Sequence, residues 1–142
     1  MTQRRYVETS LLLRVVLEGD EALRPLLLAD ARYTSALTFA EATRAILRAR
    51  LSSRLDAGGA INARRLLAEF ERCCEVVPLD DEVLHRAGQE FPVEPVRTLD
   101  AIHLATLQIL AEEFHDLDVA SSDDRIRDNA KALGLTVLPA AM

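Results

Sequence analysis

Four acidic residues stand where predicted strands end or predicted helices begin. They are far apart in the sequence, at Glu8, Glu41, Asp100 and Asp123. If the fold brings these carboxylates together, they will repel one another and raise one another's pKa values. A hard divalent cation such as Mg²⁺ relieves this repulsion because it prefers oxygen ligands. Such a cation also orients an attacking water and neutralises phosphate charge, so the pattern is typical of metal-assisted phosphodiester hydrolysis.

The positions of the four acids depend on short strands that alternate with helices. Strands are predicted at residues 4–7, 32–34, 75–79, 117–120 and 135–139. Helices are predicted at 11–17, 21–29, 35–54, 62–74, 81–90, 98–114 with Thr98 as its cap, and after a cap at 121–124 as far as 133. This alternation predicts an α/β fold, a three-layer α/β/α sandwich with a short parallel sheet, because parallel strands need crossovers that are usually helices. Ligands bind at the carboxyl edge of such sheets, where all four acids are expected to lie.

Each acid also has a purely structural interpretation. Asp100 would sit in the first turn of a helix, where the helix dipole favours an anion by roughly 0.3–1 kcal/mol. Glu41 is spaced for a surface ion pair with Arg44 on its own helix. Glu8 could face solvent at the end of its strand, and Asp123 could serve only as a helix cap. The metal-site hypothesis therefore rests on the joint placement of the four acids.

Length and charge narrow the class of protein. The 142 residues fit one domain spanning 1–142. A net charge of -6 argues against a uniformly basic nucleic-acid-binding protein, although it leaves room for local basic patches. Lys131 is the only lysine, so the basic side chains are almost all arginines, which suit bidentate phosphate contacts.

Targeting segments and soft-metal motifs are not evident in the sequence. There is no secretory signal or run of roughly 20 apolar residues, so a cytoplasmic protein without a membrane partner is expected. Cys73 and Cys74 are adjacent, which is neither a redox nor a zinc spacing, and they are expected to be small, partly buried residues. His85, His103 and His115 are scattered and do not form a zinc-binding pair.

Several segments, in order, resemble the PIN domain, and most of all the VapC-type toxins of bacterial toxin–antitoxin pairs. The segments are Tyr-Val-Glu-Thr-Ser at 6–10, Thr-Phe-Ala-Glu at 38–41, Leu-Asp-Ala-Ile-His-Leu-Ala at 99–105, Ser-Ser-Asp-Asp-Arg at 121–125 and Ala-Leu-Gly-Leu-Thr-Val at 132–137. The resemblance covers essentially the whole chain. The segments at 99–105 and 121–125 are the most specific.

The resemblance implies a Mg²⁺- or Mn²⁺-dependent endoribonuclease that forms a homodimer and binds a cognate antitoxin protein. It implies that Glu8, Glu41, Asp100 and Asp123 form the catalytic metal site, with Asp124 as second choice to Asp123. Ser10 matches the small polar residue beside the first acid of the family. Glu8 departs from the pattern because the family most often has Asp there, and the extra methylene must place the carboxylate differently.

Substrate and partner contacts are expected beside the acids. Arg44, Arg48, Arg54, Arg64 and Arg65 are candidate contacts to RNA phosphates, although an ordinary solvated face is the alternative. The family implies that an antitoxin peptide would cross the same acidic groove. Two other functions stay open to comparison. One is a catalytically silent PIN-like interaction module; the other is a phospho-receiver domain, whose paired acid after the first strand and late lysine are not found.

Overall fold

The computed structural model describes residues 2–142 and contains one parallel sheet. The sheet order is β3-β2-β1-β4-β5, so the first strand of the chain lies at its centre. The strands are β1 (Arg4–Val7), β2 (Ala31–Ser35), β3 (Glu75–Val77), β4 (Leu117–Ala120) and β5 (Thr136–Leu138). The pairing register places Tyr6 beside Tyr33 on one side and Val119 on the other. The predicted short parallel sheet is confirmed.

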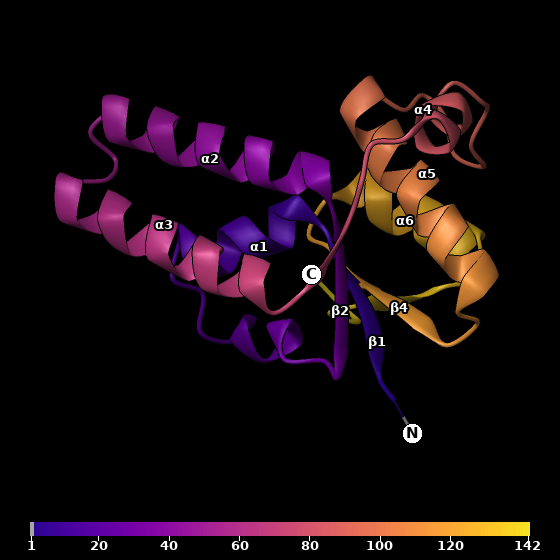
Figure 1. Ribbon diagram of the computed structural model, residues 1–142, viewed down its shortest axis with the longest axis horizontal. Coiled ribbons are helices and arrows are strands. Elements are labelled where there is room, and N and C mark those ends of the chain that lie inside the picture. Colours follow the sequence, from indigo (N-terminus) through magenta and orange to yellow (C-terminus); the bar gives the residue numbers. More distant parts are fainter. Residues whose placement is uncertain (1) are drawn as a thin grey trace.

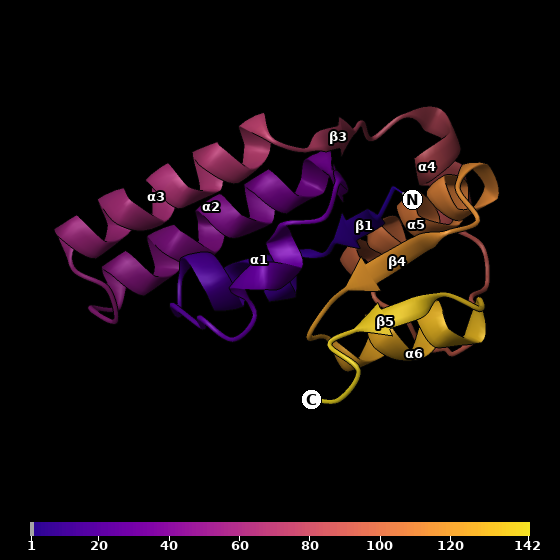
Figure 2. The ribbon, with the colours of Figure 1, turned by 90° about the horizontal axis from the view of Figure 1, so that it is seen from below.

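Helices cover both faces of this sheet (Figure 1). They are α1 (Thr9–Val16), α2 (Ala36–Leu51), α3 (Ala57–Arg72), α4 (Asp81–Ala87), α5 (Thr98–Glu113) and α6 (Asp124–Ala132). Figure 1 shows α1 to α3 on one side of the sheet and α4 to α6 on the other. The predicted three-layer α/β/α sandwich is therefore confirmed. Figure 2 shows that α2 and α3 form a hairpin that extends beyond the sheet.

Two hydrophobic cores follow from the alternation of side chains along each strand. Tyr6 and Val119 point toward α4, α5 and α6, where they pack with Leu104 and other buried residues. Val7 and the α2 residue Ile46 belong to the second core, between the sheet and α1 to α3. Alternate strand residues face opposite sides of a sheet, so a four-residue strand supplies both cores. Both cores hold the strand ends, and with them the helix starts, in fixed positions.

Side-chain caps place polar groups at the carboxyl edge of the sheet. Glu8 directly follows β1, Ser35 is the last residue of β2, and Asp123 lies in the turn after β4. Each accepts a hydrogen bond from a backbone N–H in the first turn of the next helix. The expected cap of α5 is wrong. Arg97 occupies that position without a side-chain hydrogen bond, and Thr98 is already the first helical residue.

Two other expected boundaries are wrong for local reasons. The helix expected at 21–29 is only a short 3₁₀ turn, η1 (Arg24–Leu27), because Pro25 has no N–H to continue an α-helix. The predicted turn at 56–59 is instead the start of α3, which begins at Ala57. The side chain of Asp56 accepts a hydrogen bond from the N–H of Gly59, and this cap allows both glycines to lie in the first helical turn.

The loop between α4 and α5 is fastened to the rest of the fold. Asn129 on α6 accepts a hydrogen bond from the N–H of Val93 and donates one to the Val93 carbonyl. Within the loop, the Glu94 carboxylate accepts hydrogen bonds from the N–H groups of Phe91 and Val96. Phe91 is buried in the core beside α5. These contacts hold the loop beside the first turn of α5, where Asp100 lies.

Candidate active site

Glu8 is buried at the carboxyl end of β1, with only 4% of its surface exposed. Its Oε2 accepts a hydrogen bond from the N–H of Ser10 at 3.1 Å. Its Oε1 accepts hydrogen bonds from the hydroxyl of Ser10 and, at 2.6 Å, from the hydroxyl of Ser121. Glu8 is therefore not the solvent-facing residue that one interpretation of the sequence allowed. Its carboxylate is fixed by groups that follow β1 and β4.

The turn after β4 is tied to the turn after β1 by the same serines. The N–H of Ser122 donates to the Ser10 hydroxyl at 3.0 Å, and the N–H of Asp123 donates to the Ser121 hydroxyl at 3.1 Å. Asp123 Oδ1 accepts a hydrogen bond from the N–H of Ile126, so Asp123 does cap α6. These contacts bring Asp123 to the edge of the sheet where Glu8 lies. Ser10 fixes the Glu8 carboxylate through its N–H and its hydroxyl.

Asp100 lies half-buried in the first turn of α5, facing the other acids. Its pKa is raised by burial first, and then by the negative charges of Asp123, Glu8 and Glu41. The other three sequence-predicted acids are thus near enough to Asp100 to raise its pKa, although the four come from separate segments. The structure places Asp124 differently, because it is exposed on the first turn of α6.

Glu41 lies in α2, and its position differs from the predicted ion pair with Arg44. Its Oε1 accepts hydrogen bonds from the Thr9 hydroxyl at 2.7 Å and from His103 Nε2 at 2.6 Å. Burial alone would raise the pKa of Glu41, but the hydrogen bond from His103, the charge of His103 and the bond from Thr9 outweigh it and lower that pKa. Glu41 is therefore kept ionised beside the other three acids.

His103 is the residue that sequence reasoning missed. It was grouped with two scattered histidines, yet it lies three residues after Asp100 on α5 and is completely buried. Burial alone would lower the pKa of His103, but its hydrogen bond to Glu41 and the charges of Glu8, Glu41 and Asp100 raise it. The helical spacing of three between Asp100 and His103 was the available signal, since residues at i and i+3 share a face.

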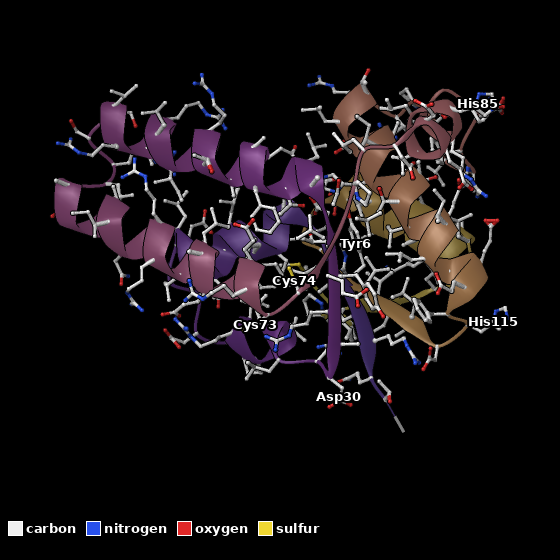
Figure 3. The ribbon with its side chains drawn as sticks, in the orientation of Figure 1. Tyr6, Asp30, Cys73, Cys74, His85 and His115 are labelled. Atoms are coloured by element: carbon white, nitrogen blue, oxygen red, sulfur yellow. The ribbon has the colours of Figure 1, made fainter. Side chains whose placement is uncertain are left out.

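The other histidines and the cysteines lie elsewhere (Figure 3). His85 and His115 are exposed at the outer side of the α4 to α6 layer, whereas Tyr6, the partner of His103, lies at the centre of the molecule. Cys74 is half-buried as expected, and burial raises the pKa of its thiol to about 11. Cys73 is exposed, which differs from the expectation of a partly buried residue.

In the described part of the chain, acidic side chains at the amino edge of the sheet are paired with arginines, whereas those at the carboxyl edge are not. At the amino edge, Asp116 pairs with Arg4 at 3.0 Å, and Asp118 pairs with the buried Arg5 at 2.7 Å. At the carboxyl edge, none of the four candidate acids forms an ion pair with an arginine or lysine within residues 2–142, and the one basic side chain paired with any of them there is His103, with Glu41. The negative charge at this edge is therefore not neutralised by arginines or lysines of the described chain, and a bound cation would neutralise it.

The donor set suits a hard divalent cation in water-rich coordination. Among the described residues, no three acidic, histidine or cysteine side chains converge closely enough to hold a metal directly as they stand. Mg²⁺ is commonly held by one or two carboxylates together with waters and substrate phosphates, so a closed protein cage is not required. Oxygen donors with unbalanced charge fit this ion better than a soft metal that needs thiolates.

Two grooves adjoin the acids. One contains Asp100 and Asp123 and is bordered by Arg97, Arg125 and the loop residues Pro95 and Val96. The other contains Glu41 and is bordered by Arg44, Arg48, Leu37, Ala40 and Leu99. Arg54, Arg64 and Arg65 border neither groove, and Arg65 is paired with Glu69 at 2.7 Å. Of the five arginines proposed from the sequence, the structure places two beside the acids, and it adds Arg97 and Arg125.

Removal of the Asp100 charge distinguishes a repulsive cluster from a helix-stabilising role. A carboxyl whose pKa is raised on folding destabilises the folded state when it ionises. The metal-free protein is therefore expected to gain stability as the pH falls from neutral through that raised pKa. In chelator at neutral pH, Asp100→Asn should leave the melting temperature unchanged or higher, and it should remove this part of the pH dependence.

The control for this measurement is Asp124→Asn, which removes an exposed first-turn carboxylate from α6. Its melting temperature should fall slightly because only a favourable helix-dipole contact is lost. A fall in the melting temperature of Asp100→Asn as large as that of the control, or larger, would contradict the acid cluster.

Comparison with known proteins agrees with this arrangement. The PIN domain family model matches residues 5–132. The chain is 39% identical over 136 residues to Ribonuclease VapC46 of Mycobacterium tuberculosis (strain ATCC 25618 / H37Rv), covering 94% of this chain and 95% of the relative. It is 36% identical over 139 residues to Ribonuclease VapC35 of Mycobacterium tuberculosis (strain CDC 1551 / Oshkosh), covering 94% of each. The chain belongs to the PIN-domain family, and the resemblance to VapC-type proteins is confirmed.

Solved structures share the fold at low sequence identity. VapBC2 from Rickettsia felis, bound to a DNA fragment from its promoter, aligns with a TM-score of 0.60 at 10% identity, covering 95% of this chain and 97% of that chain. PAE2754 from Pyrobaculum aerophilum aligns with a TM-score of 0.58 at 20% identity, covering 97% of this chain and 91% of that chain. Within residues 2–142, no helix is both long and apolar enough to cross a bilayer.

Proposed function

We propose that this protein is a divalent-metal-dependent endoribonuclease and the toxin of a type II toxin–antitoxin pair. The observation that carries the proposal is the set of four carboxylates at one sheet edge, none of which pairs with an arginine or lysine in residues 2–142. The curated relatives that cover nearly the whole chain are ribonucleases by name, which supports the same reaction class. The substrate is RNA and the reaction is hydrolysis of a phosphodiester bond.

The acids divide the work of holding the cation, Mg²⁺ or Mn²⁺. Asp100 and Asp123 line one groove and would bind directly or through water, with the buried Glu8 behind them. Glu41 would bind from the second groove. A bound divalent cation supplies an activated water and neutralises charge on the phosphate. The chain itself contributes the orientation of these carboxylates, which the serines fix for Glu8 and His103 fixes for Glu41.

RNA would reach the acids between two pairs of arginines. Arg44 and Arg48 border the groove of Glu41, and Arg97 and Arg125 border the groove of Asp100. None of these four forms an ion pair with an acidic side chain of the described chain, so their guanidinium groups are available to phosphates. This arrangement supports a strand that crosses the acids with basic contacts on both sides, despite the net negative charge of the whole protein.

Replacement of Arg44 and Arg48 by glutamine should weaken RNA binding without moving the acids. In chelator, where cleavage stops, we expect roughly tenfold weaker binding of a short single-stranded RNA near 0.1 M salt. The slope of log affinity against log salt should fall by about 1.4, because each lost phosphate contact contributes about 0.7 for a single strand. Fluorescence anisotropy over a salt series measures both quantities.

The matched control removes the same charge from the same hairpin. Arg50 and Arg54 are exposed and border neither groove, so Arg50→Gln with Arg54→Gln should change affinity little. Equal weakening by the two double variants would mean that RNA responds only to net charge and would contradict the assigned path.

An antitoxin protein is the proposed partner. A solved structure that shares the fold of this chain, from Rickettsia felis, is named VapBC2, and this name supports a partner of the antitoxin class. A peptide from such a partner would use the apolar residues Leu37 and Leu99 and the acids of the same grooves, so it would compete with RNA. The homodimer implied by the resemblance stays a prediction, which light scattering of the purified chain checks. The cytoplasmic location expected from the sequence also stays a prediction.

A catalytically silent PIN-like interaction module is the second candidate. It is favoured by the fact that both oxygens of Glu8 already accept hydrogen bonds.

The experiment that separates the ribonuclease from the interaction module uses purified protein with a mixed RNA pool in Mg²⁺, Mn²⁺ or chelator, beside a DNA pool of matched lengths. The ribonuclease cleaves RNA only with metal. A folded, partner-free protein that cleaves no RNA in either metal contradicts the ribonuclease and supports the interaction module.

A further inference from the structure

His103 forms a buried bridge between the sheet and Glu41. Its Nδ1 lies 2.6 Å from the Tyr6 hydroxyl, and its Nε2 lies 2.6 Å from Glu41 Oε1. The rings of Tyr6 and His103 meet edge to face, with centroids 6.1 Å apart. Tyr6 and His103 are both fully buried, on the central strand and on α5. The hydrogen bond from the central strand β1, through Tyr6, therefore fixes the orientation of the imidazole.

The direction of the hydrogen bonds follows from the acceptor at one end. An ionised carboxylate only accepts, so Nε2 carries the hydrogen that is donated to Glu41. The Tyr6 hydroxyl is hydrogen-bonded to the other ring nitrogen, Nδ1, and this bond keeps the Nε2 edge of the ring turned toward Glu41 on α2. This is how an outer group orients a carboxylate without touching what the carboxylate binds.

A second set of hydroxyls acts on the same oxygen of Glu41. The Thr9 hydroxyl donates to Oε1 and lies 3.3 Å from the Thr38 hydroxyl. Thr38 in turn lies 2.8 Å from the Thr34 hydroxyl, which donates to the carbonyl of Val7 at 2.7 Å. Within residues 2–142, no hydrogen bond reaches Oε2 of Glu41, so one carboxylate oxygen is held and the other is available. Glu41 stays 24% exposed by its side chain, and without these donors it could rotate toward solvent.

The contact between His103 and Glu41 is not explained by the stability of the fold alone. A buried hydrogen-bonded ionic contact is often no more stabilising than well-packed apolar residues of similar volume. Thr106, one turn further along α5, shows the ordinary solution for a buried polar residue, since it donates to the carbonyl of Ile102 in its own helix. His103 instead sends its hydrogen bond across to α2, to the side chain that faces the groove.

We propose that His103, backed by Tyr6, is a positioning residue that fixes the side-chain conformation of Glu41 for cation binding. The proposal rests on the proposed function, since Glu41 must serve the metal site. His103 does not touch the substrate or the cation; it acts only through Glu41.

A double-mutant cycle with Glu41 tests this role. We expect His103→Leu to lower Mn²⁺ affinity and the kcat of RNA cleavage by about 10- to 100-fold, with little change in KM. His103→Gln keeps an N–H donor near the Nε2 position and should restore most of both. In a Glu41→Gln background, His103→Leu should have no further effect on either quantity. Calorimetry with Mn²⁺ alone gives a readout that does not depend on cleavage.

Two further variants keep the test sharp. Thr106→Val removes another buried polar group from α5 and should leave Mn²⁺ affinity unchanged, so it controls for a general loss of stability. If His103→Leu does not fold, Tyr6→Phe removes only the hydroxyl that holds Nδ1, and its smaller loss of Mn²⁺ affinity should likewise vanish in the Glu41→Gln background. Losses that persist undiminished in that background, or equal losses in Thr106→Val, would overturn the positioning role. A folded wild-type chain that neither binds Mn²⁺ nor cleaves RNA would overturn the proposed function itself, and this role with it.

Discussion

Replacement of Asp100 by asparagine is expected to abolish metal-dependent RNA cleavage. The change removes one of the two carboxylates that line the groove and leaves the volume of the side chain almost unaltered. Loss of several kcal/mol of charge stabilisation in the transition state corresponds to a fall in kcat/KM of about 10²-fold or more. Rates of cleavage of a labelled RNA in Mg²⁺ and in Mn²⁺, with circular dichroism to verify folding, measure this effect.

The neighbouring pair Asp123 and Asp124 supplies the matched control. Asp123→Asn should also lower cleavage strongly, whereas Asp124→Asn should change it by less than about threefold, because exposed surface changes away from a site have small effects. Equal losses at the two positions would indicate a general charge effect and would contradict the assignment of Asp123. An Asp100→Asn variant that retains full metal-dependent cleavage would remove Asp100 from the site.

Changes at Glu8 are expected to have the second largest effect. Glu8→Gln removes the charge and sets an amide against the hydroxyls of Ser10 and Ser121, and we expect roughly 10²-fold slower cleavage. Glu8→Asp keeps the charge and remains a good helix cap, but its shorter side chain withdraws the carboxylate from the Ser121 hydroxyl. We therefore expect a smaller loss, about tenfold, since misplacement by about 1 Å is already costly.

The two Glu8 variants test whether glutamate at this position lowers activity relative to the aspartate that the family resemblance leads us to expect there. Single-turnover cleavage and Mn²⁺ calorimetry on both variants separate loss of chemistry from loss of metal. Because the hydroxyls of Ser10 and Ser121 fit the longer side chain, glutamate should outperform aspartate in this chain. Faster cleavage by Glu8→Asp than by the wild type would contradict this and would mark Glu8 as a weakening substitution.

The strands and most helix starts could be predicted because local chemistry decides them. Residues 4–7 form a strand whose successive side chains Tyr6 and Val7 enter opposite cores, and Glu8 then ends the strand as the cap of α1. The sequence reasoning failed where one residue overrode a pattern. Pro25 reduced an expected helix to a 3₁₀ turn, and the cap at Asp56 let α3 begin through two glycines.

The candidate site could be predicted only as far as topology carries it. Strand ends and helix starts meet at one edge of a parallel sheet, so proximity of Glu8, Asp100 and Asp123 follows from the order of elements. The partner of Glu41 could not be found in this way, because His103 is 62 residues away in sequence and meets it through packing of α5 against the sheet. The loop that brings Arg97 to the groove is likewise fixed by a distant contact, from Asn129 to Val93.

The most direct test of a metal site at this edge is an anomalous difference map from a crystal of the wild-type protein soaked in Mn²⁺. The account predicts a peak among Glu8, Asp100 and Asp123, with Glu41 bound directly or through a water. A map with no peak there, from a crystal in which solvent reaches the groove, would contradict the central claim. So would a peak found only at acids elsewhere, such as Glu82 and Glu112 around Arg86.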